Sequence, residues 1–116
     1  MYLRWKYGFK KGDLVENINQ TKNRNIYIIV SIKENIYLGA KVIIEKDKAT
    51  NLKWHYTLND KDKILLIKYD NFSVLKTDSI KKSNYKINSN IYNLINKIYS
   101  LKEETKEERK IEHKKN

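Results

Sequence analysis

Histidine and arginine side chains are few in this 116-residue chain, and they are the groups best suited to move a proton or bind a phosphate near neutral pH. His113 lies in a strongly charged segment, where a solvated surface position is expected. His55 lies between Trp54 and Tyr56 in an alternating run, which predicts that it projects from one face of a strand and both rings from the other. A structural or solvent-facing role is the simpler interpretation of His55, and proton transfer or phosphate contact is the alternative.

Arginine is the preferred cation for charge on a phosphate, because its guanidinium meets two oxygens at once and stays protonated. Arg4 stands at the very start of the sequence, and Arg109 lies in the charged C-terminal segment. Arg24 directly precedes the most apolar run of the chain, in a loop rich in polar residues. It is therefore the best candidate to stabilise charge on a phosphate, with a solvated loop arginine as the alternative.

Several kinds of chemistry are excluded by composition. The chain has no cysteine, which rules out disulfides, thiolate zinc sites, iron–sulfur clusters and cysteine nucleophiles. Neither histidine has a partner at metal-ligand spacing, and no glycine-rich phosphate loop is present. Asp60 and Asp62 could share a magnesium ion, but the lysine that follows each makes a turn the simpler interpretation. We expect no cofactor and no bound metal. RNA chemistry needs neither, because the 2′-hydroxyl of RNA is itself a nucleophile.

The charge balance indicates an acidic partner. Lys and Arg number 25 against 14 Asp and Glu, a formal charge of +11. The segment 102–116 contains six basic and five acidic residues, and the excess therefore lies almost wholly on residues 1–101. A basic face of this kind attracts nucleic acid or an acidic protein. Lysine supplies 22 of the 25 basic residues, and AT-rich codon usage is an alternative source of part of that excess.

Aromatic residues alternate with lysine at two places in the sequence, Trp5-Lys6-Tyr7 and Lys53-Trp54-His55-Tyr56. This combination can stack unpaired bases while the lysines follow the phosphates. Core packing is the competing interpretation of Trp54, because the chain has only two phenylalanines to fill a core.

The elements that must position these groups are mainly strands. They are expected at residues 9–15 (after a turn at Gly12-Asp13), 26–32, 37–44, 52–58, 64–69 and 72–75. The run 26–32 is β-branched and aromatic throughout, as in a central strand covered on both faces. Apolar residues at helical spacing predict one closing helix over 91–101, capped by Asn88 or Ser89.

This pattern predicts a mainly β fold with a C-terminal α-helix, a small antiparallel sheet or SH3-like barrel of about five or six strands. Residues 1–101 form the domain, and residues 102–116 form a charged helical extension or disordered tail. The apolar runs are too short to cross a bilayer, and the first residues do not resemble a signal peptide. A cytoplasmic protein without membrane contact is expected.

Three stretches together resemble the MazF/PemK-type toxins of toxin–antitoxin systems. Residues 9–15 (FKKGDLV) are similar to the opening strand of that family, with a basic residue, Gly-Asp and an apolar pair. Residues 28–31 (IIVS) are similar to the apolar strand ending in Ser after the family's first loop. Residues 72–82 (FSVLKTDSIKK) resemble its late strand and turn, and the following helix and the length also agree. The resemblance covers roughly residues 9–101.

The resemblance implies a homodimeric SH3-like barrel that cuts single-stranded RNA without metal and is held inactive by an antitoxin with an acidic tail. The family's Arg-Pro pair falls at Asn25-Ile26, one residue after Arg24, and its Thr or Ser falls near Asp47, with Thr50 the nearest hydroxyl. The resulting candidates are Arg24, Thr50 and His55 for catalysis, and Lys22, Lys46, Lys48, Lys53 and Trp54 for RNA binding.

Two other functions fit the same residues. The offset Arg-Pro position favours both, and one of them is a basic module that binds RNA or DNA without cleaving it. The other is an interaction protein of a phage or mobile element, whose basic surface covers an acidic site on another protein. Because one fold hosts many functions, the expected barrel does not choose among the three.

Overall fold

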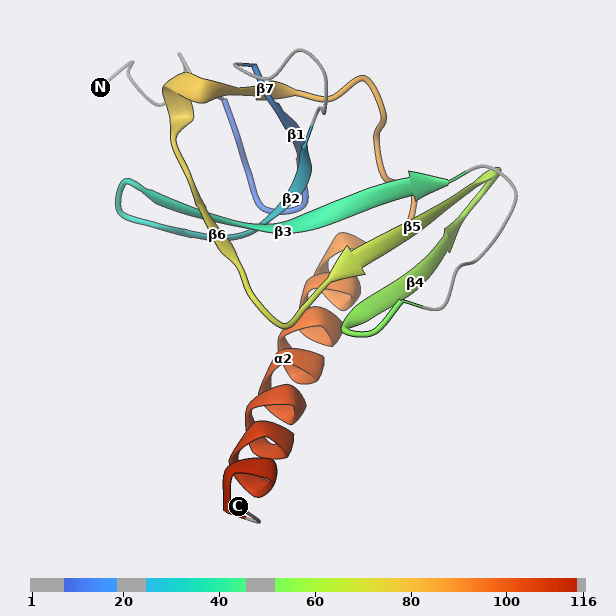
Figure 1. Ribbon diagram of the computed structural model, residues 1–116. Coiled ribbons are helices and arrows are strands. Elements are labelled where there is room, and N and C mark those ends of the chain that lie inside the picture. The colour runs from blue at the N-terminus through green and yellow to red at the C-terminus, as the bar shows by residue number, and fades with distance from the viewer. Residues whose placement is uncertain (1–7, 19–24, 46–51, 115–116) are drawn as a thin grey trace.

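A computed structural model describes residues 8–18, 25–45 and 52–114 of the chain, with side chains described as far as residue 107 (Figure 1). Seven strands and one long helix make up these residues. The strands are β1 (Leu14–Asn17), β2 (Ile26–Lys33), β3 (Ile36–Glu45), β4 (His55–Asp60), β5 (Lys63–Lys68), β6 (Ser73–Leu75) and β7 (Ile80–Lys82). A 3₁₀ turn, η1 (Thr77–Ser79), separates β6 from β7, and helix α2 (Ile91–Lys114) follows. The expected mainly β fold with a C-terminal helix is confirmed.

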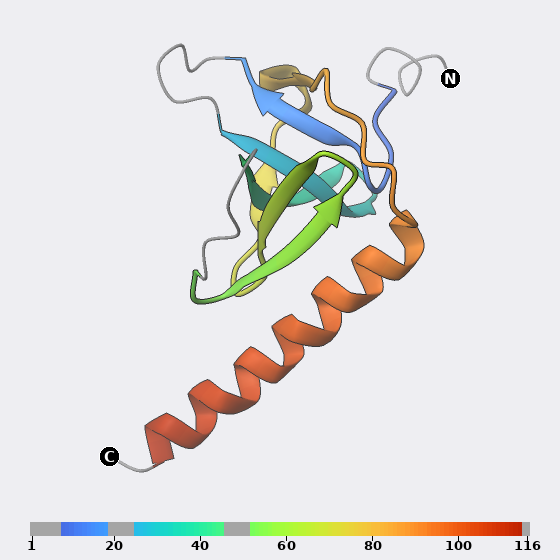
Figure 2. The same cartoon turned by 90° about the vertical axis from the view of Figure 1, so that its right-hand side faces the viewer.

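All strand pairs are antiparallel, in the order β4-β5-β3-β2-β1-β7. Strand β3 is long enough to pair with two strands on the same side. Its first part pairs with β6, Gly39 opposite Ser73, and its second part pairs with β5, Glu45 opposite Ile64. Figure 2 shows α2 running along one side of the sheet.

Strand β2 is covered on both faces, as its unbroken apolar composition predicts. Ile28 and Val30 are fully buried in the cluster that also contains Leu94 and Ile98 of α2. Ile29 is equally buried in a second cluster on the other face, with Leu75 of β6. A central strand whose first five residues are all aliphatic or aromatic therefore contributes to two cores at once.

Strand β2 is hydrogen-bonded to helix α2 at a register shift in its pairing with β3. The shift lies between Ile29 and Ser31, and it leaves Val30 without a ladder partner in that pair. The hydroxyl of Tyr99 donates a hydrogen bond to the Val30 carbonyl at 3.3 Å. The side chain of Tyr99 also packs edge-on against Phe72, with ring centroids 5.4 Å apart. Helix α2 thus satisfies a backbone group that the sheet leaves open.

The structure corrects several of the expected elements. Strand β4 begins at His55 and not at residue 52, and strand β7 was not expected. Helix α2 continues without interruption to Lys114, which is the helical one of the two alternatives expected after residue 101. Its cap is neither Asn88 nor Ser89: the helix begins after Asn90, whose Oδ1 accepts the Asn93 N–H at 3.1 Å.

Asn88 and Ser89 instead bind a buried carboxylate, Asp60, at the end of β4. Asp60 is 1% exposed. It accepts hydrogen bonds from the Ser89 hydroxyl at 2.7 Å, from the backbone N–H groups of Ser89 and Asn88 at 3.0 Å each, and from the hydroxyl of Tyr85. The two-residue turn expected around Asp60 and Asp62 is confirmed, since β4 ends at Asp60 and β5 begins at Lys63.

These hydrogen bonds decide the ionisation of Asp60. Burial by itself opposes the charged form, but the hydrogen bonds from Tyr85, Ser89 and Asn88 outweigh it and lower the pKa of Asp60 from 3.8 to about 2. Burial and the neighbouring carboxylate of Asp60 raise the pKa of Tyr85 to about 12. Tyr85 therefore remains a hydrogen-bond donor, and Asp60 an acceptor, across the physiological range.

We expect Asp60→Asn to lower the free energy of unfolding by about 2–4 kcal/mol at neutral pH, because a buried group that accepts several donors is replaced by one that accepts fewer. The lowered pKa adds a pH dependence. The contribution of Asp60 is complete above its unfolded pKa of 3.8 and is lost as the pH falls through about 2. Urea unfolding at several pH values measures both effects.

The difference in free energy of unfolding between the wild type and Asp60→Asn should decrease by about 2 kcal/mol as the pH falls from about 5 to about 2. Asp62→Asn, an exposed carboxylate in the same turn, is the matched control and should follow the wild type. A pH-independent gap would show that the charge of Asp60 does not anchor the segment before α2.

Candidate nucleic-acid interface

Five of the residues expected to contact RNA lie outside the described residues: Arg24, Lys22, Thr50, Lys46 and Lys48. The strand ends that flank them are described. Ile26 pairs with Val42, so the end of β3 at Glu45 extends past the start of β2. The backbone of Asn25 accepts the Asn17 N–H at 3.1 Å, which holds the end of β1 at the same place. The segments 19–24 and 46–51 are therefore both joined to the sheet at this end.

Three of the expected residues, Lys53, Trp54 and His55, lie together where β4 begins. This is the end of the β4–β5 pair away from the turn between Asp60 and Lys63. The Lys53 ammonium lies 4.8 Å from the centroid of the Trp54 ring. The Trp54 ring is half-buried and packs edge-on against Tyr69, with centroids 6.4 Å apart. The Nδ1 atom of His55 lies 2.9 Å from the Lys53 carbonyl oxygen. We call these four residues the Lys53–His55 corner.

The contact of His55 fixes its tautomer. A carbonyl oxygen only accepts hydrogen bonds, so Nδ1 must carry the proton and donate it. In the neutral ring, Nε2 then holds the free lone pair. His55 therefore offers an acceptor at Nε2, with its ring held against the backbone of Lys53.

Trp54 does not lie on a strand, which corrects the expected alternation with His55 and Tyr56. Its φ is +67°, in the left-handed region that a tryptophan rarely adopts. The turn is held by the His55 N–H, which donates to the Leu52 carbonyl at 3.3 Å, and by the Tyr69 N–H, which donates to the Trp54 carbonyl at 3.0 Å. A backbone strained in this way at a half-buried tryptophan beside a lysine is consistent with a functional constraint.

The sheet separates this corner from the start of β2. His55 pairs with Lys68, one residue beyond the row that contains Tyr56, Ile67, Val42 and Ile26. Three strand spacings lie between β4 and β2 in this row, about 14 Å along the sheet. His55 and the strand that follows Arg24 are thus not brought into direct contact.

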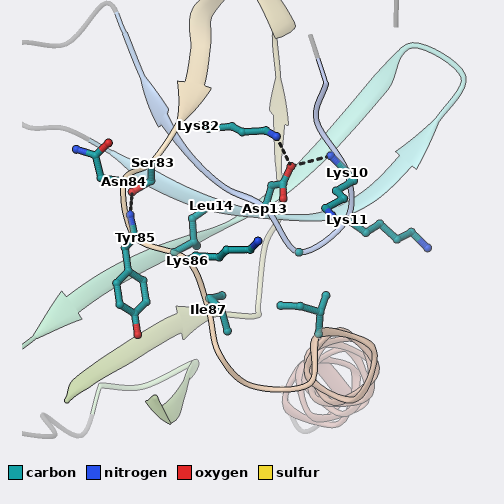
Figure 3. A pocket seen from close by; sticks show the side chains of 12 residues that line it. Lys10, Lys11, Asp13, Leu14, Lys82, Ser83, Asn84, Tyr85, Lys86 and Ile87 are labelled. Atoms are coloured by element: carbon teal, nitrogen blue, oxygen red, sulfur yellow. Dashed lines mark hydrogen bonds and ion pairs between the residues drawn. The ribbon is translucent and has the colours of Figure 1, made fainter. Parts of the chain in front are cut away.

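A second basic feature was not expected as a site: a cavity of about 350 Å³ beside the start of β1. Four lysines and one aspartate line it, Lys10, Lys11, Lys82, Lys86 and Asp13. Its apolar lining comes from Leu14, Ile87 and Ile91. Figure 3 shows Lys10 and Lys82 converging on Asp13, and Lys86 extending from the opposite wall. We call it the lysine-lined cavity. The paired lysines Lys10-Lys11 and Lys81-Lys82 were its only signal in the sequence.

Hydrogen bonds fix both walls of the lysine-lined cavity. In the first wall, the Asp13 N–H donates to the Lys10 carbonyl at 3.1 Å, and the Asp13 carboxylate accepts the Lys10 N–H at 2.9 Å. In the second wall, the Ser83 N–H donates to the Leu14 carbonyl at 2.8 Å. The same wall continues to Tyr85, whose hydroxyl is held by the buried carboxylate described above.

The first wall requires glycine at position 12. The φ of Gly12 is +90°, and a Cβ there would overlap the Cγ2 atom of Ile91 in the first turn of α2. We expect Gly12→Ala to lower the free energy of unfolding by about 1–3 kcal/mol, since it adds backbone strain to a steric overlap. Thermal unfolding measures the loss.

A Cβ at Gly39 would also overlap its neighbours, but the φ of Gly39 is not positive. Gly39→Ala is therefore the control that measures a steric overlap without the backbone strain. Adding Ile91→Ala to Gly12→Ala should recover part of the stability by removing the overlap. No recovery would mean that strain at position 12, and not contact with α2, sets the cost.

Within the described residues, no three His, Cys, Asp or Glu side chains are grouped to hold a metal ion. No helix in that part of the chain is long and apolar enough to span a membrane. Comparisons with protein-family models, curated proteins and solved structures gave no match.

Proposed function

We propose that this protein is a metal-independent endoribonuclease of the MazF/PemK type that binds single-stranded RNA on its basic surface. The observation that carries the proposal is the shared end of β1, β2 and β3. At this end β1 leads into the segment that contains Lys22 and Arg24, and β3 leads into the segment that contains Lys46, Lys48 and Thr50.

The pairing of β6 and β7 supports the finer fold, an SH3-like barrel. β6 pairs with β3 and β7 pairs with β1, on the two outer sides of the β1-β2-β3 group. Only the short turn η1 lies between β6 and β7. The segment from β6 to β7 therefore links the outer side of β3 to the outer side of β1. A link of this kind is what a small closed barrel requires.

The proposed reaction uses the nucleophile that RNA itself supplies. The 2′-oxygen loses its proton to an acceptor and forms a bond to the adjacent phosphorus, while the bond from phosphorus to the 5′-oxygen breaks. The leaving 5′-oxygen takes up a proton, and the product ends in a 2′,3′-cyclic phosphate. Arg24 stabilises the added charge on the phosphate, and Thr50 hydrogen-bonds the reacting group.

The Lys53–His55 corner has a binding role in this proposal. Because β4 and β2 are about 14 Å apart along the sheet, the proposal assigns His55 to a neighbouring nucleotide and not to the phosphate that Arg24 would hold. Lys53 contacts a phosphate, and Trp54 offers its half-buried ring to a base. The same separation favours the second candidate function, a module that binds RNA without cleaving it.

The proposal includes the assembly that the family resemblance implies. The protein acts as a homodimer and is neutralised by an acidic partner protein. The excess of positive charge on residues 1–101 supports a partner of that charge.

Cleavage of end-labelled RNA in EDTA tests the reaction. We expect discrete cuts by the wild type and a loss of at least about 100-fold in rate for Arg24→Ala, because one charge-stabilising group is removed. Thr50→Ala should also slow cleavage, and His55→Gln should raise KM more than it lowers kcat. Arg109→Ala removes the same charge from the C-terminal segment and should cleave like the wild type. Intact RNA with the wild type, across several sequences, would favour binding without cleavage.

A fluorescence titration tests the binding role of Trp54. In a Trp5→Phe background, Trp54 is the remaining indole. We expect 2′-O-methylated single-stranded RNA, which lacks the attacking hydroxyl, to quench its emission, because a base stacks on the ring. Trp54→Phe, which retains Trp5, is the control. Binding without quenching, with anisotropy as the independent readout, would place the RNA elsewhere on the surface.

A further inference from the structure

The lysine-lined cavity is the described feature that the proposed reaction leaves unused. It lies at the start of β1, three residues from the end of that strand at Asn17. That separation is about 10 Å along the strand. A single strand that contacts the proposed cleavage end of the sheet can therefore also reach the cavity, because one binding domain of this size contacts several nucleotides.

The electrostatics of the cavity favour an anion. Four lysines and a single aspartate line it, an excess of three positive charges. The ammonium of Lys82 lies 3.9 Å from the Asp13 carboxylate, and its side chain is 56% exposed, so this ion pair is weak and leaves Lys82 accessible. Lys86 extends into the same space from the second wall (Figure 3).

The start of helix α2 adds to this field. Ile91, the first residue of the helix, lines the cavity, and the first turn contains no acidic residue that would offset the positive end of the helix dipole. The cavity also has an apolar lining from Leu14 and Ile87. The combination of apolar surface with a few charged groups is typical of a ligand pocket, and about 350 Å³ is within the usual size range.

The walls are already in place without a ligand. The first is a hydrogen-bonded turn that presses against Ile91, and the second is connected through Tyr85 to Asp60. A site whose walls are already fixed by hydrogen bonds loses little entropy when it binds. This rigidity distinguishes the cavity from lysines scattered over an exposed surface.

We propose that the lysine-lined cavity binds a backbone phosphate of the single-stranded RNA, one or more nucleotides away from the phosphate held by Arg24. This inference rests on the proposed function and adds a second contact to it. Lys82 and Lys86 hold the phosphate oxygens, and the aliphatic surface of Leu14 and Ile87 supports the attached nucleoside. The exposed rim suits a continuous strand better than a free nucleotide.

Anisotropy of a labelled 2′-O-methylated RNA of about 12 nucleotides tests this contact without interference from cleavage. The test variant is the pair Lys82→Gln and Lys86→Gln. The matched control is the pair Lys61→Gln and Lys97→Gln, which removes the same charge from exposed lysines away from the cavity. We expect the test pair to bind about tenfold more weakly than the control pair. The slope of its log K against log salt should become shallower by about 0.7 for each phosphate that the variant no longer neutralises.

The outcomes separate this inference from the proposed function. Wild-type binding with equal affinities for the test and control pairs would overturn the cavity contact and leave the proposed function standing. No binding by the wild type would overturn both. Unchanged thermal unfolding of both pairs would confirm that the substitutions act on binding.

A second measurement distinguishes the source of the phosphate. AMP and inorganic phosphate are titrated into the wild type, and the backbone amides of Gly12 and Ser83 are followed by NMR. Small chemical-shift changes with AMP or inorganic phosphate, and much larger ones with RNA, support a backbone phosphate as the ligand. Saturation by AMP, with no difference between the two variant pairs toward RNA, would assign the cavity to a free nucleotide and overturn the inference.

Discussion

The buried carboxylate of Asp60 is the interaction on which the arrangement of sheet and helix depends. It lies at the end of the β4–β5 pair, and its donors all belong to the segment that leads into α2. Removing a charge from water is costly, and here hydrogen bonds from five donor groups offset that cost. This anchor holds the segment just before α2, and the burial of Leu94 and Ile98 and the hydrogen bond from Tyr99 to Val30 continue the packing along the helix.

The same anchor links stability to the proposed binding surface. The segment that Asp60 holds includes Tyr85 and continues into the second wall of the lysine-lined cavity. The first wall is held independently, by the turn at Gly12 and its contact with Ile91. A basic surface built from exposed lysines would ordinarily be adaptable, but here its backbone is fixed on both sides. The positive charge is therefore presented in one arrangement, which favours recognition over nonspecific attraction.

The elements that local sequence encodes were predicted, and those that depend on distant partners were not. The apolar run of β2 and the helical spacing after Asn90 are local, and both are confirmed. Strand β7 was missed because two of its three residues are lysines, and its extended form comes from pairing with β1. The role of Asp60 was missed because its partners lie 25 to 29 residues away. The lysine-lined cavity combines residues near position 10 with residues near position 82, which no spacing rule connects.

The place of β7 at one end of the strand order has a consequence for self-association. An edge strand offers unpaired backbone groups to any other chain, and exposed lysines at such an edge oppose pairing by charge and by bulk. Lys81 and Lys82 are both exposed on β7. Lys82, which lines the cavity, therefore also opposes the pairing of β7 with a strand of another chain. Loss of the charge at Lys81 and Lys82 would leave this edge of the sheet open to pairing with another strand.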